Sequence, residues 1–236
     1  MTCFKNQDKL KAVTFSFDDG ITQDIRMVEL LNKYNLKATF NINSELLGKR
    51  AILSRNGGMK ISHYKVWPDD VKCIYGGHEV AVHTLTHPSL VKQDDAEVVR
   101  QVEEDRKNLE ALVGYDVVGM AYPGGGVNND ERVAEIIRTK TKIQYSRTIT
   151  STGNFDLQNN LHQFNPSVYF LDWDLMMDMG KRFVELKPDK PQIFYIWRHS
   201  YEMDYDSRNW KRLEDFFELI SNREDIYYGT NREVLL

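Results

Sequence analysis

The sequence has little of several features that mark particular classes of protein. It contains only two cysteines, Cys3 and Cys73, and neither belongs to a Cys-x-x-Cys pair. A disulfide-stapled scaffold is therefore excluded, and we interpret both as ordinary thiols. No run of 18 apolar residues occurs, so no membrane-spanning helix is expected. Residues 1–12 lack the apolar stretch of a secretory signal, and a cytoplasmic location is the default expectation.

Charge bias, internal repeats and flexible linkers are also missing. Lys and Arg number 31 against 35 Asp and Glu, which leaves a net charge of -4 in 236 residues. A chain without a basic excess is not expected to have nucleic acid as its main partner. No stretch rich in Pro, Gly or Ser divides the sequence, and hydrophobic residues make up 41% of it. We therefore predict a single domain over residues 1–236 with a sizeable core.

Strand and helix patterns alternate along the chain. Strands are predicted at 11–17, 37–42, 79–83, 116–121, 143–147, 167–171 and 192–197. Helices are predicted from about residue 22, over 92–113, from a cap at Asn128 or Asn129, and from about residue 207. This order implies parallel strands joined by right-handed crossovers, closing into a barrel rather than an open sheet.

Residues 43–66 interrupt the alternation. This stretch is rich in Lys and Arg, has one acidic residue, Glu45, and contains Gly57-Gly58. It is predicted to be an inserted loop. A solvated surface excursion is the favoured interpretation, and a flap that contacts substrate is the alternative.

Candidate metal ligands follow two of the predicted strands. Asp18-Asp19-Gly20 ends the first strand, and the run His83-Thr84-Leu85-Thr86-His87 follows the strand at 79–83. In parallel α/β folds the carboxyl ends of the strands gather the ligand-binding residues. A carboxylate and two imidazoles can bind one divalent ion and leave a position open for water. The alternatives are a turn or helix cap at the Asp pair and histidines bonded to the backbone.

Other strand ends carry further candidates. His199 ends a late strand and could act as a general acid, with a buried structural histidine as the alternative. Backbone N–H groups at Tyr122-Pro123-Gly124-Gly125-Gly126 could stabilise an oxyanion, unless the segment is only a flexible turn. Tyr201 is a candidate for stacking on a sugar ring, with core packing as the alternative. The remaining histidines lack comparable partners and are interpreted as surface or structural: His63, His78 and His162.

Two of these segments resemble signatures of a known family. Ser16-Phe17-Asp18-Asp19-Gly20 resembles the first signature of the polysaccharide deacetylases, the NodB-like carbohydrate esterases. His83-Thr84-Leu85-Thr86-His87 resembles their second, a His-(Ser/Thr)-x-x-His. The resemblance extends from about residue 11 to about residue 200. It implies an α/β fold, an incomplete (β/α) barrel of about seven parallel strands, and removal of N- or O-acetyl groups from a carbohydrate.

The same resemblance implies a role for each candidate. Asp19, His83 and His87 would bind Zn²⁺ or a similar divalent ion such as Co²⁺ or Ni²⁺. Asp18 would be the general base and His199 the general acid. Ala121-Tyr122-Pro123-Gly124-Gly125 aligns with an Arg-x-Pro-x-Gly signature, which implies the Gly124 N–H as oxyanion donor. Tyr122, Pro123 and Tyr201 are then the expected contacts to an acetylated sugar.

The sequence departs from the family at three points. Ala121 stands where the family has the arginine that orients the base, and Arg147 or Arg198 could substitute for it. The fourth signature, of Asp-x-x-Asp-Trp type, has its nearest counterpart at Asp172-Trp173. The late motif reads Trp-Arg-His-Ser-Tyr-Glu instead of Leu-x-His.

Three functions are therefore compared. The leading hypothesis is a metal-dependent sugar deacetylase, and the second, motivated by the missing arginine, is a carbohydrate-binding pseudoenzyme. Glycosidic cleavage is the third, and it is disfavoured because paired carboxylates for that chemistry lie about 5–10 Å apart across the sugar, whereas Asp18 and Asp19 are neighbours.

Overall fold

In the computed structural model, residue 4, residues 9–170 and residues 172–236 are described. The strands are β1 (Lys11–Asp18), β2 (Ala38–Ile42), β3 (Arg50–Ser54), β4 (Lys60–Tyr64), β5 (Glu79–Val82), β6 (Gly119–Ala121), β7 (Tyr145–Arg147), β8 (Val168–Tyr169), β9 (Gln192–Arg198) and β10 (Ile226–Tyr228). The helices are α1 (Asp24–Lys33), α2 (Val71–Ile74), α3 (Asp95–Val113), α4 (Glu131–Lys140), α5 (Trp173–Glu185), α6 (Asn209–Ile220) and α7 (Asn231–Leu235).

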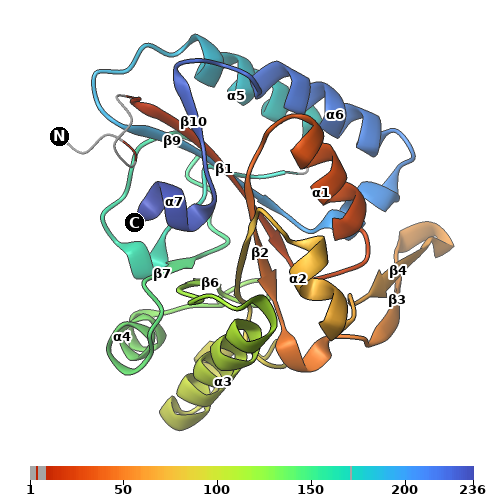
Figure 1. Ribbon diagram of the computed structural model, residues 1–236, viewed down its shortest axis with the longest axis vertical. Coiled ribbons are helices and arrows are strands. Elements are labelled where there is room, and N and C mark those ends of the chain that lie inside the picture. Colours follow the sequence, from red (N-terminus) through yellow and green to blue (C-terminus); the bar gives the residue numbers. More distant parts are fainter. Residues whose placement is uncertain (1–3, 5–8, 171) are drawn as a thin grey trace.

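One curled sheet organises the molecule. Its strands follow the order β7-β6-β5-β2-β1-β9-β8, every neighbouring pair is parallel, and β10 pairs with the start of β1. Helices α1 to α6 lie around the outside of this half-barrel (Figure 1). The predicted incomplete (β/α) barrel with about seven parallel strands is confirmed.

The alternation of residues along β1 explains how the sheet is buried on both faces. Val13, Phe15 and Phe17 belong to the large hydrophobic core that packs against the helices. Successive strand residues point to opposite faces, so Thr14, Ser16 and Asp18 point into the half-barrel. The inward-pointing residues of this central strand are therefore polar. The last of them, Asp18, lies at the carboxyl end of β1, where the candidate site is found.

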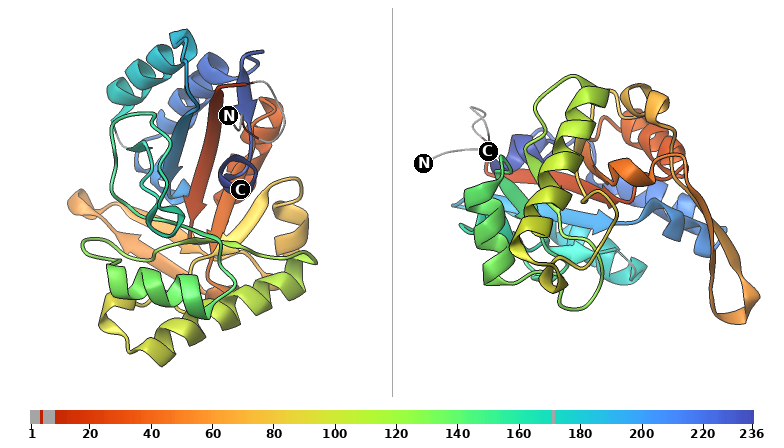
Figure 2. Two further views of the ribbon diagram at one scale, coloured as in Figure 1. Left: turned by 90° about the vertical axis from the view of Figure 1, so that its left-hand side faces the viewer. Right: turned by 90° about the horizontal axis from the view of Figure 1, so that it is seen from below.

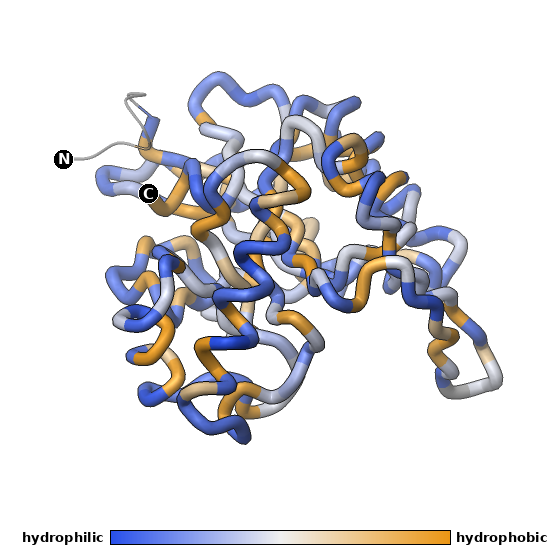
Figure 3. The backbone as a smooth tube through the Cα atoms, turned by 60° about the horizontal axis from the view of Figure 1, so that its bottom comes forward, coloured by the Kyte–Doolittle hydropathy of each residue, from blue (hydrophilic) through white to orange (hydrophobic). Residues whose placement is uncertain are grey.

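The helices cover the outer face as amphipathic elements. In Figure 3, hydrophilic and hydrophobic segments alternate along the helices, as expected for elements with one buried face. Helices α5 and α6 approach closely at Gly180, where an added Cβ would lie 2.8 Å from the Phe216 ring. Asp94 caps α3 as its N-terminal residue, and Gly114 ends that helix in the left-handed conformation.

The predicted cap of α4 was wrong by one or two positions. The side chain that accepts the Val133 N–H is Asp130. Asn128 is buried and instead donates to the carbonyl oxygens of Tyr122 and Gly124. The short Asn-Asn-Asp run offers three residues that suit an N-cap, so the sequence pattern alone does not select among them.

Residues 43–66 form an antiparallel hairpin rather than an irregular loop. Strands β3 and β4 pair from Arg50 opposite Tyr64 to Ser54 opposite Lys60. The hairpin projects from the body of the protein, as the right-hand view of Figure 2 shows. Its base is tied to the barrel, because Val66 donates to the Gly20 carbonyl and Lys65 forms a bridge with Ile21.

The end of the chain closes the amino-terminal end of the barrel. Asn231, at the start of α7, is fully buried. Its side chain accepts from the Thr14 hydroxyl at 2.8 Å and donates to the Tyr195 hydroxyl at 2.5 Å. Its backbone N–H donates to the Thr39 hydroxyl at 2.8 Å. This plug, like helix α5, was not among the predicted elements.

Within the described ranges, no helix has both the length and the apolar character needed to cross a membrane. Cys73 is an exposed free thiol, whereas Cys3 lies outside the described residues.

Candidate active site

Three predicted ligands meet at the carboxyl end of the half-barrel. Asp19, His83 and His87 each offer a ligand atom, and these atoms lie within 4.8 Å of one another. Asp19 follows β1 and the two histidines follow β5, so the site joins segments more than sixty positions apart in the sequence. One carboxylate oxygen and two imidazole nitrogens form a donor set typical of an open Zn²⁺ site.

The orientation of His83 suits a ligand that binds through Nε2. Its Nδ1 lies 2.9 Å from the carbonyl oxygen of Ala121. A carbonyl can only accept, so Nδ1 carries the proton and Nε2 keeps its lone pair. Burial lowers the pKa of His83 to about 4, against the opposing effect of Asp18, and the ring is therefore neutral at physiological pH.

The backbone around these ligands is held in unfavourable conformations. Asp19 has φ 87°, Thr84 has φ 68° and His87 has φ 63°. Positive φ is strained for residues other than glycine, by roughly 1–3 kcal/mol each. Asn43 stabilises the turn by donating to the carbonyl oxygens of His83 and Thr84. Gly20, next to Asp19, also has positive φ, and a Cβ there would lie 2.9 Å from the Ile42 side chain.

Asp18 lies inside the barrel with its charge compensated. Its side chain accepts from the Arg147 guanidinium at 2.6 and 2.5 Å and from the Asn41 amide at 2.8 Å. The residue is 2% exposed. Burial acts to raise its pKa, but the Arg147 guanidinium, with His83 and His199, outweighs burial and holds the pKa below its usual value. Asp18 is therefore ionised at neutral pH, 4.0 Å from His83 Nε2.

The arginine beside Asp18 is Arg147, which lies on β7. The family arginine was expected at position 121, on the neighbouring strand β6. Ala121 on β6 and Arg147 on β7 are direct partners in the parallel register. Arg147 therefore reaches the same interior space from one strand further along the sheet, and its guanidinium lies 4.2 Å from the centroid of the Trp197 ring.

Arg198, the second predicted substitute, lies on the other face of its strand. Phe194 and Ile196 point to the same face of β9 as Arg198, and both belong to the core under the helices. The Arg198 guanidinium lies 5.0 Å from the Phe170 ring and 5.6 Å from the Trp173 ring. The geometry thus assigns the guanidinium beside Asp18 to Arg147.

The hairpin supplies two contacts to Asp19 that the sequence did not indicate. His63 Nε2 lies 3.1 Å from Asp19 Oδ2. Lys65 Nζ donates to the Asp19 carbonyl at 2.6 Å and lies 3.3 Å from Oδ1. Burial acts to raise the pKa of Asp19, but His63 and Lys65 outweigh it and lower the pKa well below the usual value. The interpretation of His63 as a residue without a partner was therefore wrong.

His199 lines the same site and is paired with an acid. Its Nε2 is 3.9 Å from Asp19 Oδ2, and its Nδ1 is 3.6 Å from Glu202 Oε2. Burial acts to lower the pKa of His199, but the carboxylates of Glu202, Asp19 and Asp18 outweigh it and raise the pKa. Glu202 also accepts a hydrogen bond from the Tyr169 hydroxyl. Its position three residues after His199 is the one sequence signal that could have identified it.

These groups line a cavity of about 450 Å³. Gly124, in the left-handed conformation at φ 83°, is exposed at its rim, and Tyr201 forms part of the wall. Tyr122 also borders the cavity, but its ring belongs to the core and its hydroxyl donates to the His162 carbonyl. Pro123 is buried and is not among the described lining residues. The lining residues are Asp18, Asp19, His83, His87, Tyr122, Gly124, Gly125, Ile149, Tyr169, Trp197, His199 and Tyr201.

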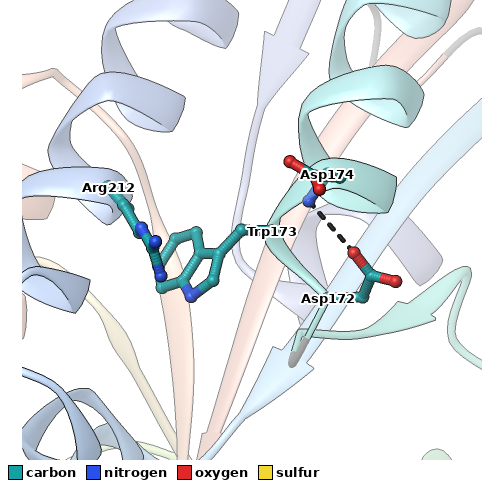
Figure 4. A pocket seen from close by; sticks show the side chains of 4 residues that line it. All are labelled: Asp172, Trp173, Asp174 and Arg212. Atoms are coloured by element: carbon teal, nitrogen blue, oxygen red, sulfur yellow. Dashed lines mark hydrogen bonds between the residues drawn. The ribbon is translucent and has the colours of Figure 1, made fainter.

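Asp172 and Trp173 lie in a different hollow. Asp172 caps α5 by accepting from the backbone of Asp174, and Arg212 lies beside the Trp173 indole (Figure 4). Among the described residues, this hollow shares no lining residue with the cavity around Asp19. The counterpart of the fourth signature, Asp172-Trp173, thus lies outside the cavity, and the acid beside His199 is Glu202.

Two similar proteins are named as peptidoglycan deacetylases. PgdA, a peptidoglycan-N-acetylglucosamine deacetylase of Listeria monocytogenes, is 31% identical over 129 residues, which are 54% of this chain and 24% of PgdA. PdaC, a peptidoglycan-N-acetylmuramic acid deacetylase of Bacillus subtilis, is 26% identical over 125 residues, which are 52% of this chain and 23% of PdaC. The chain thus spans about a quarter of the length of these relatives.

Solved structures share the fold over nearly the whole chain. A family 4 carbohydrate esterase from Streptomyces lividans in complex with acetate has a TM-score of 0.58 at 12% identity, covering 94% of this chain and 92% of the esterase. Wild-type BA3943, a CE4 family pseudoenzyme from Bacillus anthracis, has a TM-score of 0.58 at 16% identity, covering 97% of this chain and 66% of BA3943.

The sequence model of one family, described as polysaccharide deacetylase, matches residues 5–140, a span that contains both the Asp18-Asp19 pair and the His83–His87 run. With the half-barrel and the cluster of Asp19, His83 and His87 at its carboxyl end, this match shows that the chain belongs to the polysaccharide deacetylase family.

Proposed function

We propose that this chain is a metal-dependent hydrolase that removes N- or O-acetyl groups from a carbohydrate. One observation carries the proposal: an ionised Asp18, held by Arg147, lies beside the cluster of Asp19, His83 and His87, and His199 lines the same cavity. The deacetylase names of the relatives support a glycan with N-acetylated sugars, such as peptidoglycan, as the substrate.

The donor set fits a divalent ion of the Zn²⁺ type. A neutral His83 with a free Nε2, a second imidazole from His87 and a carboxylate from Asp19 provide three ligands. Bound there, such an ion would supply Lewis acidity, which lowers the pKa of a coordinated water to about 7. Co²⁺ or Ni²⁺ would suit the same ligands, and we propose Zn²⁺ as the native ion.

Asp18 is the proposed general base. It is ionised and buried, and its two oxygens are oriented by Arg147 and Asn41. A carboxylate fixed in this way can accept the proton of the attacking water at Oδ2, the oxygen that lies toward His83. Arg147 then contributes by keeping Asp18 ionised and in place, the role that the family arginine would perform from position 121.

His199 is the proposed general acid. The surrounding carboxylates raise its pKa, so the imidazolium is available near neutral pH to protonate the departing amine or alcohol. Glu202 lies behind Nδ1, which leaves Nε2 directed toward Asp19 and the cavity. The base and the acid thus come from the ends of adjacent strands, β1 and β9, and both line the cavity in which an acetyl group would lie.

Gly124 is the proposed oxyanion donor. The side chain of Asn128 donates to the carbonyl oxygens of Tyr122 and Gly124 and so fixes the conformation of this loop. A preorganised backbone N–H at the rim of the cavity can stabilise the negative charge that develops on the acetyl oxygen.

An acetate-release assay tests the proposal. Acetylated chito- and xylo-oligosaccharides are incubated with protein loaded with Zn²⁺, Co²⁺ or Ni²⁺. We expect Asp18→Asn to keep its metal and lose turnover, while Asp172→Asn, in the separate hollow, keeps both. Retained turnover in Asp18→Asn would remove Asp18 from the base role.

Ala121 keeps the carbohydrate-binding pseudoenzyme as the second candidate. That function predicts binding of the same oligosaccharides with no acetate released under any metal. The contact between Arg147 and Asp18 favours the enzyme, because it restores the guanidinium that position 121 lacks.

A further inference from the structure

The hairpin of β3 and β4 is a basic arm on an otherwise acidic chain. Residues 49–65 contain five Lys and Arg side chains and no Asp or Glu. Because the whole chain carries -4 and this segment +5, the remaining residues carry a net charge of -9. Lys65 is buried against Asp19, and the other four basic side chains are exposed. A projection with this excess of positive charge beside a substrate cavity is a candidate for recognising substrate of the opposite sign.

One face of the arm is anchored to the wall of the active site. Ile61 is buried in a small cluster with Ile21 and Tyr201, against which Leu53 and Tyr205 also pack. His63, on the same face of β4 as Ile61, contacts Asp19. The arm is therefore continuous with the cavity on this side, and a sugar chain leaving the cavity here would run along the arm.

A line of rings leads from the general acid to the basic arm. The rings of His199 and Tyr201 are 5.1 Å apart, and those of Tyr201 and Tyr205 are 6.1 Å apart. The guanidinium of Arg55 lies 4.5 Å from the centroid of the Tyr205 ring. Aromatic rings with a polar edge suit the mixed apolar and hydroxylated surface of sugars.

Arg55, at the outer end of this line, presents a charge that is not neutralised within the described chain. It is exposed, it rests on the Tyr205 ring, and one of its nitrogens donates to the Tyr205 hydroxyl. Among the described residues, no carboxylate forms an ion pair with it. A guanidinium placed over a ring, with one nitrogen bonded to the ring's hydroxyl, keeps its remaining N–H groups available in the fork geometry that matches a carboxylate or phosphate.

We propose that the strip formed by Tyr201, Tyr205 and Arg55 is an extended subsite for the sugar chain, and that Arg55 binds an anionic substituent on a sugar beyond the one that reacts. The substrate class is then an acidic glycan rather than a neutral one. This inference rests on the proposed function, because it assumes that the acetylated sugar occupies the cavity at Asp19.

Calorimetric binding tests the subsite without turnover. The protein carries Asp18→Asn and is loaded with Zn²⁺. The probes are chitotetraose, which is neutral, a hyaluronan tetrasaccharide, which has N-acetylated sugars and carboxylates, and chitotetraose 6-phosphate. We expect at least one anionic probe to bind more tightly than chitotetraose at low salt, and the tighter of the two identifies the anionic group.

The variants isolate Arg55. Arg55→Gln should lower the affinity for the anionic probe about tenfold, which is the effect of losing one charge-assisted contact. It should change the affinity for chitotetraose less than about twofold. Lys60→Gln removes the same charge from the opposite face of β4 and should leave both affinities unchanged. Equal losses in Arg55→Gln and Lys60→Gln, or no preference for either anionic probe, would overturn the subsite.

The outcome is separable from that of the proposed function. Binding is read as heat and not as acetate, so a pseudoenzyme with this subsite would still show the loss in Arg55→Gln. An active deacetylase without the subsite would release acetate equally well from neutral and anionic oligosaccharides and would be insensitive to Arg55→Gln.

Discussion

Replacing Arg147 by methionine tests whether this residue performs the role of the missing arginine. The side chain is fully buried, and its guanidinium contacts both oxygens of Asp18. Methionine fills similar space without a charge, so Asp18 would keep only the Asn41 amide as a donor. Removing one partner of a buried ion pair costs about 3–5 kcal/mol.

The same change should alter the chemistry in a way that a packing defect would not. Burial raises the pKa of Asp18, and in Arg147→Met that effect is no longer opposed by its strongest partner. The base is then protonated to higher pH, so the acidic limb of the kcat profile moves upward. Turnover at neutral pH should fall by roughly 10²–10⁴-fold, the range for loss of a general base.

The assay is acetate release across pH, with urea unfolding measured in parallel. Arg198→Met is the matched control, because it removes a buried arginine on the outer face of β9 and should destabilise the fold without moving the acidic limb. The double variant Ala121→Arg/Arg147→Ala should recover part of the activity, since the two positions are partners in the register. An unchanged pH profile in Arg147→Met would refute this role.

Three further outcomes follow from the contacts described. His63→Gln should weaken Zn²⁺ affinity, measured by calorimetry, because it loosens the carboxylate of Asp19; unchanged affinity would make the hairpin contact incidental. Asn231→Ala removes a hydrogen-bond partner from two buried hydroxyls, those of Thr14 and Tyr195, and should lower the free energy of unfolding in urea by about 2–4 kcal/mol, whereas the exposed Asn159→Ala should lower it by almost nothing. Burial lowers the pKa of His78 from 6.5 to about 4, so the unfolded chain binds more protons between these values and stability falls as pH drops from 6.5 toward 4. His78→Gln should remove up to about 3 kcal/mol of this acid-dependent loss, and an identical pH dependence in the variant would contradict the buried neutral ring.

The fold and the meeting of Asp19, His83 and His87 could be predicted because they depend on local patterns. The alternation of Val13, Phe15 and Phe17 with polar residues gives the strand and its two faces, and a strand end is where a parallel sheet places its site. The same alternation could not have chosen between Arg147 and Arg198. Phe194 and Ile196 lie on one face of β9 and Ile193, Tyr195 and Trp197 on the other, so both faces are apolar and only the structure shows that Arg198 shares the face that packs against the helices.

The contacts to Asp19 from the hairpin could not be predicted in this way. His63 and Lys65 reach Asp19 only because β4 returns along the edge of the barrel, and no short-range pattern records where an inserted hairpin will pack. The plug at Asn231 is similar, since its partners Thr14, Thr39 and Tyr195 are distant in the sequence and meet only when the sheet curls.

The most direct measurement is acetate release and zinc content determined on the same samples of the wild-type chain and of His83→Ala. An intact site predicts about one Zn²⁺ per wild-type chain together with turnover, and the loss of both when the buried imidazole is removed. Undiminished acetate release by zinc-free His83→Ala protein would contradict a mechanism built on a bound cation.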